Sequence, residues 1–107
     1  MKVFAAINFL SSDEGGRDRP LSAGTYYPTT TVTENGQSST WSLVLELIDQ
    51  DDKGVWYATC GFLAETAPYH LLHPEYRLDL YEGPHLVGNL RVLMPANVVK
   101  EVYATAP

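Results

Sequence analysis

Alternation between apolar and polar positions is the strongest pattern along the chain, and it predicts a series of β-strands. In the segment 40–49, tryptophan and leucine recur at every second position, which gives a strand one apolar face. The segment 3–10 is apolar at nearly every position, as in a strand that is covered on both faces. Four further segments, rich in β-branched, aromatic and other apolar residues, complete a set of six strands: 25–33, 55–63, 76–83 and 86–94.

Residues that favour turns separate the predicted strands. Asn35-Gly36 is a strong hairpin signal because both residues tolerate a positive φ, and turns are also expected at 50–54 and 83–85. Pro28 cannot donate a ladder hydrogen bond, so it belongs at an edge, at a bulge or at the start of a strand. Short strands at such close spacing predict one all-β domain, either a closed barrel or a sandwich.

The two ends of the chain fit this pattern less clearly. Residues 97–104, which follow Pro95, predict either a last strand or a short terminal helix. The segment 1–10 contains a single lysine and no small-residue cleavage site, so a strand is favoured over an export signal.

Composition and charge narrow the classes of function. The chain has 107 residues, of which 45% are hydrophobic and 19% charged, as is typical of one globular domain. Thirteen acidic residues outweigh seven basic ones, and the net charge is −6. This charge opposes binding to nucleic acid and to anionic membrane surfaces, because both depend on cationic side chains. No apolar run is long enough to cross a bilayer, and we expect no membrane partner.

Cys60 is the single cysteine, which excludes an internal disulfide and a four-thiolate metal site. A single cysteine with no possible disulfide partner in the chain fits a reducing cytoplasm best. A nucleophilic thiol needs a histidine or a helix N-terminus nearby to lower its pKa. Cys60 instead lies within a predicted strand among apolar neighbours, which favours a buried and unreactive thiol.

The stretch SSDEGGRDRP, residues 11–20, raises the question of a phosphate-binding loop. Such a loop needs a lysine near its end and a helix that follows it. Neither is present here, and the carboxylates of Asp13, Glu14 and Asp18 would repel a phosphate. We therefore interpret the stretch as a connecting loop, and we expect no nucleotide and no other cofactor.

A second candidate for chemistry is YHLLHPE, which contains His70, His73 and Glu75. Two histidines three positions apart share a face of a helix and suit zinc. Pro68 and Pro74 oppose a long helix, and the spacing supplies no third strong ligand. A metal site here is an alternative to a surface loop with two solvated histidines.

Aromatic residues point to a different kind of function. The chain has seven tyrosines and two tryptophans. Strand alternation directs about half of such side chains inward, and exposed tyrosines and tryptophans are favoured at protein interfaces. No catalytic motif accompanies them, so we expect a protein partner and not an enzyme.

Two stretches carry motifs in a recognisable order. The first runs through DEGGR at 13–17, Pro20, GTYYP at 24–28 and TTTVTENG at 29–36, and the second is YEGPHLVG at 81–88. They resemble the third, C-terminal β-barrel domain of elongation factor Tu. In that family a D/E-E-G-G-R loop leads to G-Y-R-P and T-T-x-V-T-G, and the closing hairpin reads R-E-G-x-x-V-G-x-G.

The resemblance spans about residues 3–93 and implies that 1–107 is a single closed six-stranded antiparallel β-barrel domain. In the elongation factor, the third domain helps to hold aminoacyl-tRNA and contacts proteins. The nucleotide-binding domain of the factor has no counterpart in these residues, so the resemblance implies no GTPase activity. Matching positions give the candidate binding residues Arg17, Tyr26, Tyr27, Thr30, Tyr81, Glu82 and His85.

Departures from the family motif bear on the choice of partner. Tyr27 stands where G-Y-R-P has its arginine, and Tyr81 and His85 stand at the arginine positions of the R-E-G-G-R region. Leu90 replaces the second glycine of G-x-G. The loss of cationic positions, together with the net charge of −6, disfavours tRNA binding.

The preferred interpretation is a non-enzymatic, cytoplasmic, translation-factor-like module that binds another protein or a second copy of itself. One alternative is residual tRNA or RNA binding, for which a basic stripe must gather Arg17, Arg19, Arg77 and Arg91 on one face. The other alternative is a small metal-binding protein that uses His70 and His73.

Overall fold

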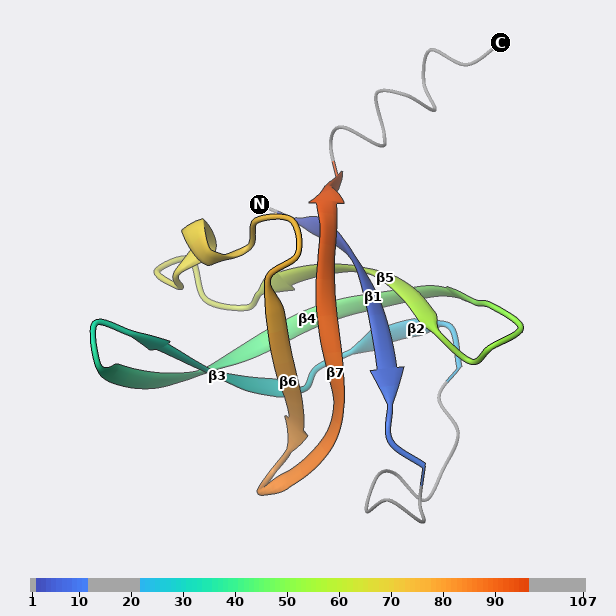
Figure 1. The fold of residues 1–107 in the computed structure, drawn as a ribbon, viewed down its shortest axis with the longest axis horizontal. Coiled ribbons are helices and arrows are strands. Elements are labelled where there is room, and N and C mark those ends of the chain that lie inside the picture. Colours follow the sequence, from blue (N-terminus) through green and yellow to red (C-terminus); the bar gives the residue numbers. More distant parts are fainter. Residues whose placement is uncertain (1, 12–21, 97–107) are drawn as a thin grey trace, which may run out of the picture.

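The structure is a computed structural model that describes residues 2–11 and 22–96 (Figure 1). The described residues form seven β-strands and a short 3₁₀ turn. The elements are β1 (Val3–Phe9), β2 (Gly24–Tyr26), β3 (Thr29–Glu34), β4 (Gln37–Gln50), β5 (Trp56–Phe62), the 3₁₀ turn η2 (Tyr69–Leu71), β6 (Arg77–Glu82) and β7 (His85–Pro95). The predicted all-β class is confirmed.

The number of strands differs from the predicted six because the segment 25–33 is not one strand. It is divided at Pro28 into β2 and β3, and both pair with β4. Pro28 has no N–H to give to the ladder, but its carbonyl accepts a hydrogen bond from the Leu43 N–H at 2.8 Å. The proline therefore interrupts the strand without detaching it from its neighbour.

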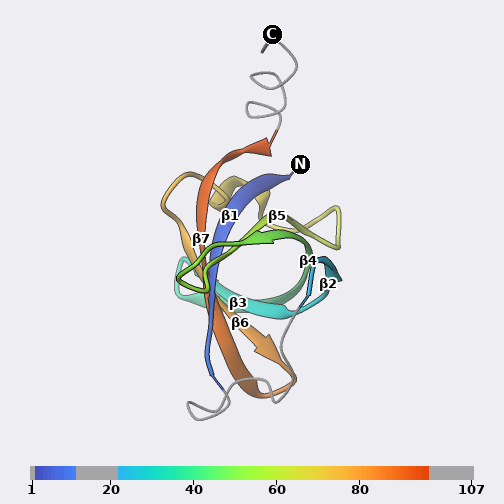
Figure 2. The same ribbon diagram turned by 90° about the vertical axis from the view of Figure 1, so that its right-hand side faces the viewer.

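The strands form one antiparallel sheet in the order β2-β4-β3-β6-β7-β1-β5. β4 also pairs with β5, so the pairings from β4 through β3, β6, β7, β1 and β5 return to β4. Figure 2 shows these strands curving around a common interior. β4 reaches three partners because it is 14 residues long.

The pairing between β3 and β6 is the shortest in this series. A single residue pair, Thr29 opposite Tyr81, joins the two strands. In contrast, β1 pairs with β7 along its whole length. Few backbone hydrogen bonds can therefore join β3 to β6, and side-chain contacts contribute more to this junction than to the others.

Strand alternation builds the core as the sequence predicts. Leu43 and Leu45 of β4, and Val3, Ala5 and Ile7 of β1, are fully buried and face one interior cluster. Burying a side chain of this size contributes about 1.5–3 kcal/mol relative to leaving it exposed. On the outer face of β1, Ala6 is buried, Phe4 is half-buried and Asn8 is exposed, so the expectation of a strand covered on both faces is met only in part.

Among the described glycines, Gly36 and Gly88 illustrate two different constraints. Asn35 and Gly36 have φ values of 52° and 78° and form the predicted two-residue turn between β3 and β4. Gly88 of β7 packs against β1, where an added Cβ would lie 2.6 Å from the Asn8 carbonyl oxygen. The first position requires a positive φ, and the second requires the absence of a side chain.

The expectations for the two ends of the chain have different outcomes. Residues 3–9 form β1, as predicted, between β5 and β7. Residues 97–104 lie outside the described residues. In the part of the chain that the structure describes, no helix has the length and apolar character to cross a membrane.

Candidate functional site

Four of the seven candidate residues, Tyr26, Thr30, Tyr81 and Glu82, meet where β3 approaches β6, and we call this region the β3–β6 seam. Tyr26 donates a hydrogen bond through its hydroxyl to the Glu82 carboxylate. The Tyr26 ring also packs edge-on against Phe9, with ring centroids 5.8 Å apart. The seam therefore collects residues from three distant segments of the sequence.

Thr30 supplies the buried part of the seam. Its side chain is 0% exposed, and its hydroxyl donates a hydrogen bond of 2.7 Å to the backbone carbonyl of Asp79. A buried hydroxyl without a partner is costly, so this bond both satisfies Thr30 and joins β3 to β6. The role of Thr30 in the described structure is to hold the seam together from inside.

The remaining candidates lie on the rim of the seam or outside the described residues. His85 is exposed and pairs with Glu82 across the turn between β6 and β7. Tyr27 is 61% exposed, and Leu86 is 40% exposed beside His85. Arg17 lies outside the described residues. The rim thus combines exposed apolar surface with the acidic group of Glu82.

The two histidines of the metal alternative have other contacts. His70 Nε2 lies 2.6 Å from Glu34 Oε2, so η2 is tied to the end of β3. His73 approaches its neighbouring carbonyl, that of Pro74, at 3.2 Å and packs against the Tyr76 ring. Within residues 2–11 and 22–96, no three His, Cys, Asp or Glu side chains form a group that could hold a metal ion.

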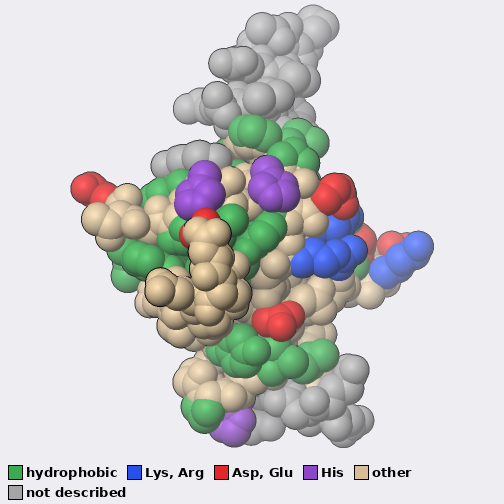
Figure 3. All heavy atoms as spheres, turned by 60° about the vertical axis from the view of Figure 1, so that its left-hand side comes forward, with side chains coloured by type: hydrophobic (Ala, Val, Ile, Leu, Met, Phe, Trp, Pro, Cys, Tyr) green, Lys and Arg blue, Asp and Glu red, His purple; other side chains and the backbone are tan. Residues whose placement is uncertain are grey.

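Two of the four arginines of the RNA alternative come together. Arg77 and Arg91 are paired directly across β6 and β7. However, Arg91 forms a salt bridge of 3.1 Å with Glu75. Figure 3 shows basic side chains lying next to acidic ones on this face and no broad basic surface. Arg17 and Arg19 lie outside the described residues.

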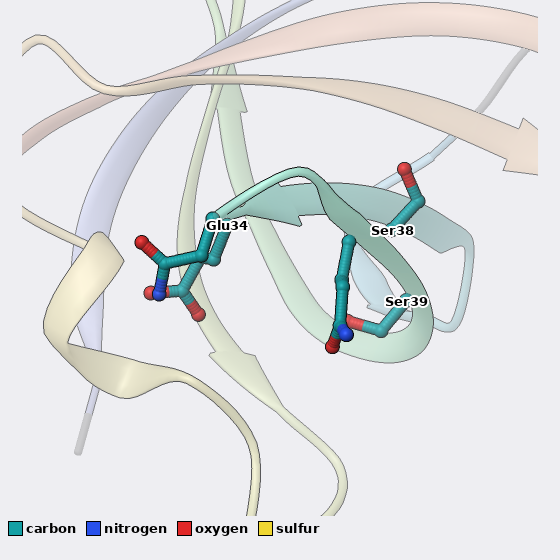
Figure 4. Close-up of a pocket in the computed structure, with 5 residues that line it drawn as sticks. Glu34, Ser38 and Ser39 are labelled. Carbon is teal, nitrogen blue, oxygen red and sulfur yellow. The ribbon is translucent and has the colours of Figure 1, made fainter.

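A hollow of about 300 Å³ lies on the hairpin of β3 and β4. Glu34 points toward η2, whereas Ser38 and Ser39 project in different directions (Figure 4). The Ser38 hydroxyl lies 2.8 Å from that of Thr33, and Ser39 accepts a hydrogen bond of 2.8 Å from the Trp41 indole. Neither of these contacts pairs a serine hydroxyl with a general base. The hollow is lined by Glu34, Asn35, Gln37, Ser38 and Ser39.

Cys60 is fully buried on β5, as the sequence predicted. Burial raises the pKa of its thiol to about 12. The reactive form of a cysteine is the thiolate, which is scarce at neutral pH when the pKa is this high. The environment of Cys60 therefore opposes a nucleophilic role.

Asp51 organises the turn between β4 and β5. Its Oδ1 accepts hydrogen bonds of 2.9 Å from the N–H groups of Val55 and Lys53, and its Oδ2 accepts one of 3.3 Å from the Tyr57 hydroxyl. These bonds, led by the one from Val55, lower the pKa of Asp51 from its usual 3.8. The pKa of Tyr57 is raised, mainly by desolvation of its hydroxyl and to a smaller extent by the negative charge of Asp51. The turn is predicted by the sequence, but the role of its carboxylate is not.

Comparisons with known proteins add no assignment to this geometry: no model of a known family matches the chain, and no curated protein matches it.

Sequence reasoning also missed the partners that complete the seam. Phe9 and the Asp79 carbonyl were not among the candidates, although they contact Tyr26 and Thr30. No local motif marks either of them. The available signal was the alternation of β1 and β6, which places Phe9 and Asp79 on strands but does not say which strands are neighbours.

Proposed function

We propose that this protein is a non-enzymatic binding module whose partner is another protein. In this proposal the ring of pairings is a closed six-stranded barrel, with β2 as an additional short strand on β4, and the fold is that of the third domain of elongation factor Tu. The return of the pairings to β4 supports closure. The division of the second predicted strand at Pro28 accounts for the seventh strand.

The observation that carries the proposal is the composition of the β3–β6 seam. Tyr26 and Glu82 are fixed by their mutual hydrogen bond, while Tyr27, the next residue along the chain, and Leu86, which pairs with Tyr81, are exposed. A rigid polar centre flanked by exposed aromatic and aliphatic side chains is typical of protein interfaces. The preferred partner presents apolar groups to Tyr27 and Leu86.

The environment of the chemical groups supports a binding role over a catalytic one. The Cys60 thiol is buried, with its pKa raised to about 12, and the serines of the hairpin hollow are engaged with neighbours. In this proposal the protein acts in the cytoplasm, where a buried and unpaired cysteine persists as a thiol.

Site-specific cross-linking tests the proposal. A photoreactive phenylalanine analogue at position 27 should capture a protein partner from the native cell lysate. The same analogue at Ile48, which is 54% exposed on β4, is the matched control. Capture of one protein at position 27 and not at position 48 supports the proposal. Absence of any specific cross-link at position 27 would count against it.

RNA binding is the second candidate, favoured by the direct pairing of Arg77 with Arg91. Two arginines paired across neighbouring strands suit a phosphate backbone, although the Arg91 salt bridge with Glu75 and the net charge of −6 oppose RNA binding. Filter binding to bulk tRNA at low salt tests this function. Retention that falls when Arg77 and Arg91 are both changed to Ala would support it, and no retention at micromolar protein would reject it.

A further inference from the structure

The hairpin formed by β3 and β4 extends beyond the rest of the sheet (Figure 1). β3 pairs with β4 from Thr29 opposite Ser42 to Glu34 opposite Gln37. β5 pairs with the other edge of β4 only from Leu43 onward. Among the described residues, no strand pairs with the outer edge of the segment 37–41, and we call this segment the free β4 edge.

The register of the hairpin shows which backbone groups point out of the free β4 edge. Glu34 and Gln37 close a two-residue turn, so they are a hydrogen-bonded pair. Alternation then directs the N–H and C=O groups of Ser38 and Thr40 away from β3. Ser42 follows the same alternation, and its carbonyl accepts a hydrogen bond of 2.9 Å from Leu63 on that side. Ser38 and Thr40 therefore present donors and acceptors for an added strand.

The side chains of this edge do nothing to block such a strand. Proteins usually protect exposed edges with lysine, other charges, proline or a bulge. The segment 29–42 has one charged residue, Glu34, and its carboxylate contacts His70. The segment 38–40 consists of exposed serine and threonine residues. This neutral, small-residue edge differs from the rest of a chain whose net charge is −6.

We propose that the free β4 edge pairs in an antiparallel manner with the same edge of a second copy of this chain. In this arrangement Ser38 of each copy lies opposite Thr40 of the other, and each such pair exchanges both of its backbone hydrogen bonds. Ser39 lies on the two-fold axis, opposite its own counterpart. The result is a closed, isologous dimer with a continuous sheet through both hairpins.

Two observations favour a second copy over a different protein as the occupant. The register is self-complementary, because the outward-pointing residues are placed symmetrically about Ser39. In addition, two chains that each have a net charge of −6 repel each other. Their electrostatic repulsion is smallest where a neutral segment of one faces a neutral segment of the other. Leu63, which is 61% exposed next to Ser42, lies beside the end of the added strand and gains apolar contact there.

This inference rests on the proposed function in one respect, namely that the protein binds protein, but it uses a surface other than the β3–β6 seam. The two are therefore separable by experiment. A variant that lacks self-pairing should keep its cross-link at position 27. If self-pairing fails in every test while the cross-link at position 27 persists, the inference is wrong and the proposed function stands.

Disulfide trapping tests the register directly. In the dimer, Ser39 faces its counterpart as a non-hydrogen-bonded pair, whose Cα atoms are about 4.5 Å apart and suit a disulfide. Ser39→Cys should form a cross-linked dimer under mild oxidation. Ser38→Cys is the matched control, because that residue faces Thr40 of the other copy and not itself. Cys60 is buried in both variants.

We expect Ser39→Cys to cross-link at least tenfold faster than Ser38→Cys in the full-length chain. Equal rates for the two variants would overturn the proposed register. No cross-link in either variant, together with a monomeric mass up to about 1 mM protein, would overturn the dimer itself.

Edge-blocking variants test the same dimer without a thiol. Thr40→Lys and Thr31→Lys each add one positive charge and remove the same hydroxyl contact, that between Thr31 and Thr40 at 3.2 Å. Only Thr40 lies on the free β4 edge. Sedimentation velocity over a concentration series should show at least a tenfold weaker association for Thr40→Lys and less than a twofold change for Thr31→Lys.

Thr40→Pro is a stronger edge variant, since it removes an N–H that β3 does not use. Circular dichroism shows whether Thr40→Pro folds. If this variant is unfolded, the dimer is tested with Thr40→Lys alone. An equal effect of Thr40→Lys and Thr31→Lys, or no effect of either, would overturn the inference.

Discussion

Tyr26 donates a hydrogen bond to Glu82, a residue 56 positions away along the chain. β2, which contains Tyr26, has β4 as its ladder partner, yet this side chain reaches β6. The contact therefore ties the short strand to the far side of the β3–β6 seam. It also fixes the two polar groups around which the proposed protein-binding surface is arranged.

A double-mutant cycle measures this contact. Tyr26→Phe and Glu82→Ala each remove one partner, and urea denaturation of both single variants and the double variant gives the coupling. We expect a coupling free energy of about 1–2 kcal/mol, because the hydrogen bond is made to a carboxyl group at a partly buried site. Tyr27→Phe, on the neighbouring exposed residue, should change stability by less than about 0.5 kcal/mol. Strictly additive effects would show that the two side chains do not interact in solution.

Thr30 should be the most sensitive hydroxyl of β3. Thr30→Val keeps the shape of the side chain but removes, from a fully buried position, the donor that bonds to the Asp79 carbonyl across the seam. We expect a loss of about 1–3 kcal/mol in the free energy of unfolding. Thr31→Val, on the exposed face of the same strand, is the control and should cost less than about 0.5 kcal/mol. Equal losses in the two variants would contradict the structural role of Thr30.

Gly88 allows β7 to approach β1. An alanine Cβ at this position would lie 2.6 Å from the Asn8 carbonyl oxygen and 3.1 Å from the Phe9 Cα, so the backbone must move. We expect Gly88→Ala to cost about 3 kcal/mol by chemical denaturation. Asn89→Ala, one residue further along β7, controls for the substitution itself. A Gly88→Ala variant as stable as the parent would show that the two strands are further apart than described.

The Cys60 thiol should be inert in the native protein. Its pKa is raised to about 12 by burial, and its side chain is fully enclosed. A thiol reagent such as Ellman's reagent should react at pH 8 only after denaturation in guanidinium. Rapid reaction of the native protein would contradict the burial of Cys60 and would restore the nucleophile hypothesis.

Asp51 should make stability depend on pH in the acid range. Its pKa is lowered in the folded chain, so its carboxylate stabilises the fold fully above the ordinary value of 3.8. This contribution is lost as the pH falls through the folded pKa. The melting temperature of Asp51→Asn should therefore lie below that of the parent at pH 7, and the difference should shrink below pH 4. A difference that does not change with pH would exclude this role.

The sequence predicts those features of the fold that depend on neighbouring residues. The burial of Leu43 and Leu45 follows from a period of two, and the turn at Asn35-Gly36 follows from their tolerance of positive φ. Pro28 was expected at an edge, at a bulge or at the start of a strand, and it immediately precedes β3, but the break between β2 and β3 was not predicted.

The contacts of the candidate site depend on pairing between distant strands, which local patterns do not encode. Tyr26 and Glu82 were both candidates, but nothing in the sequence indicated that they touch. His70 illustrates the same limit. The metal hypothesis sought its partners nearby in the sequence, whereas the carboxylate that contacts it, Glu34, lies 36 positions away.

The position of β1 between β5 and β7 has a consequence for the order of synthesis. Among the described strands β1 leaves the ribosome first, yet its second edge is covered only by β7, which leaves last. Three side chains of β1 are fully buried in the complete fold, namely Val3, Ala5 and Ile7. Until β7 has been made, these side chains lack part of the packing that buries them. Folding of this chain during translation therefore cannot be completed before residue 95 has emerged, and a nascent chain stalled earlier should expose an apolar strand to chaperones.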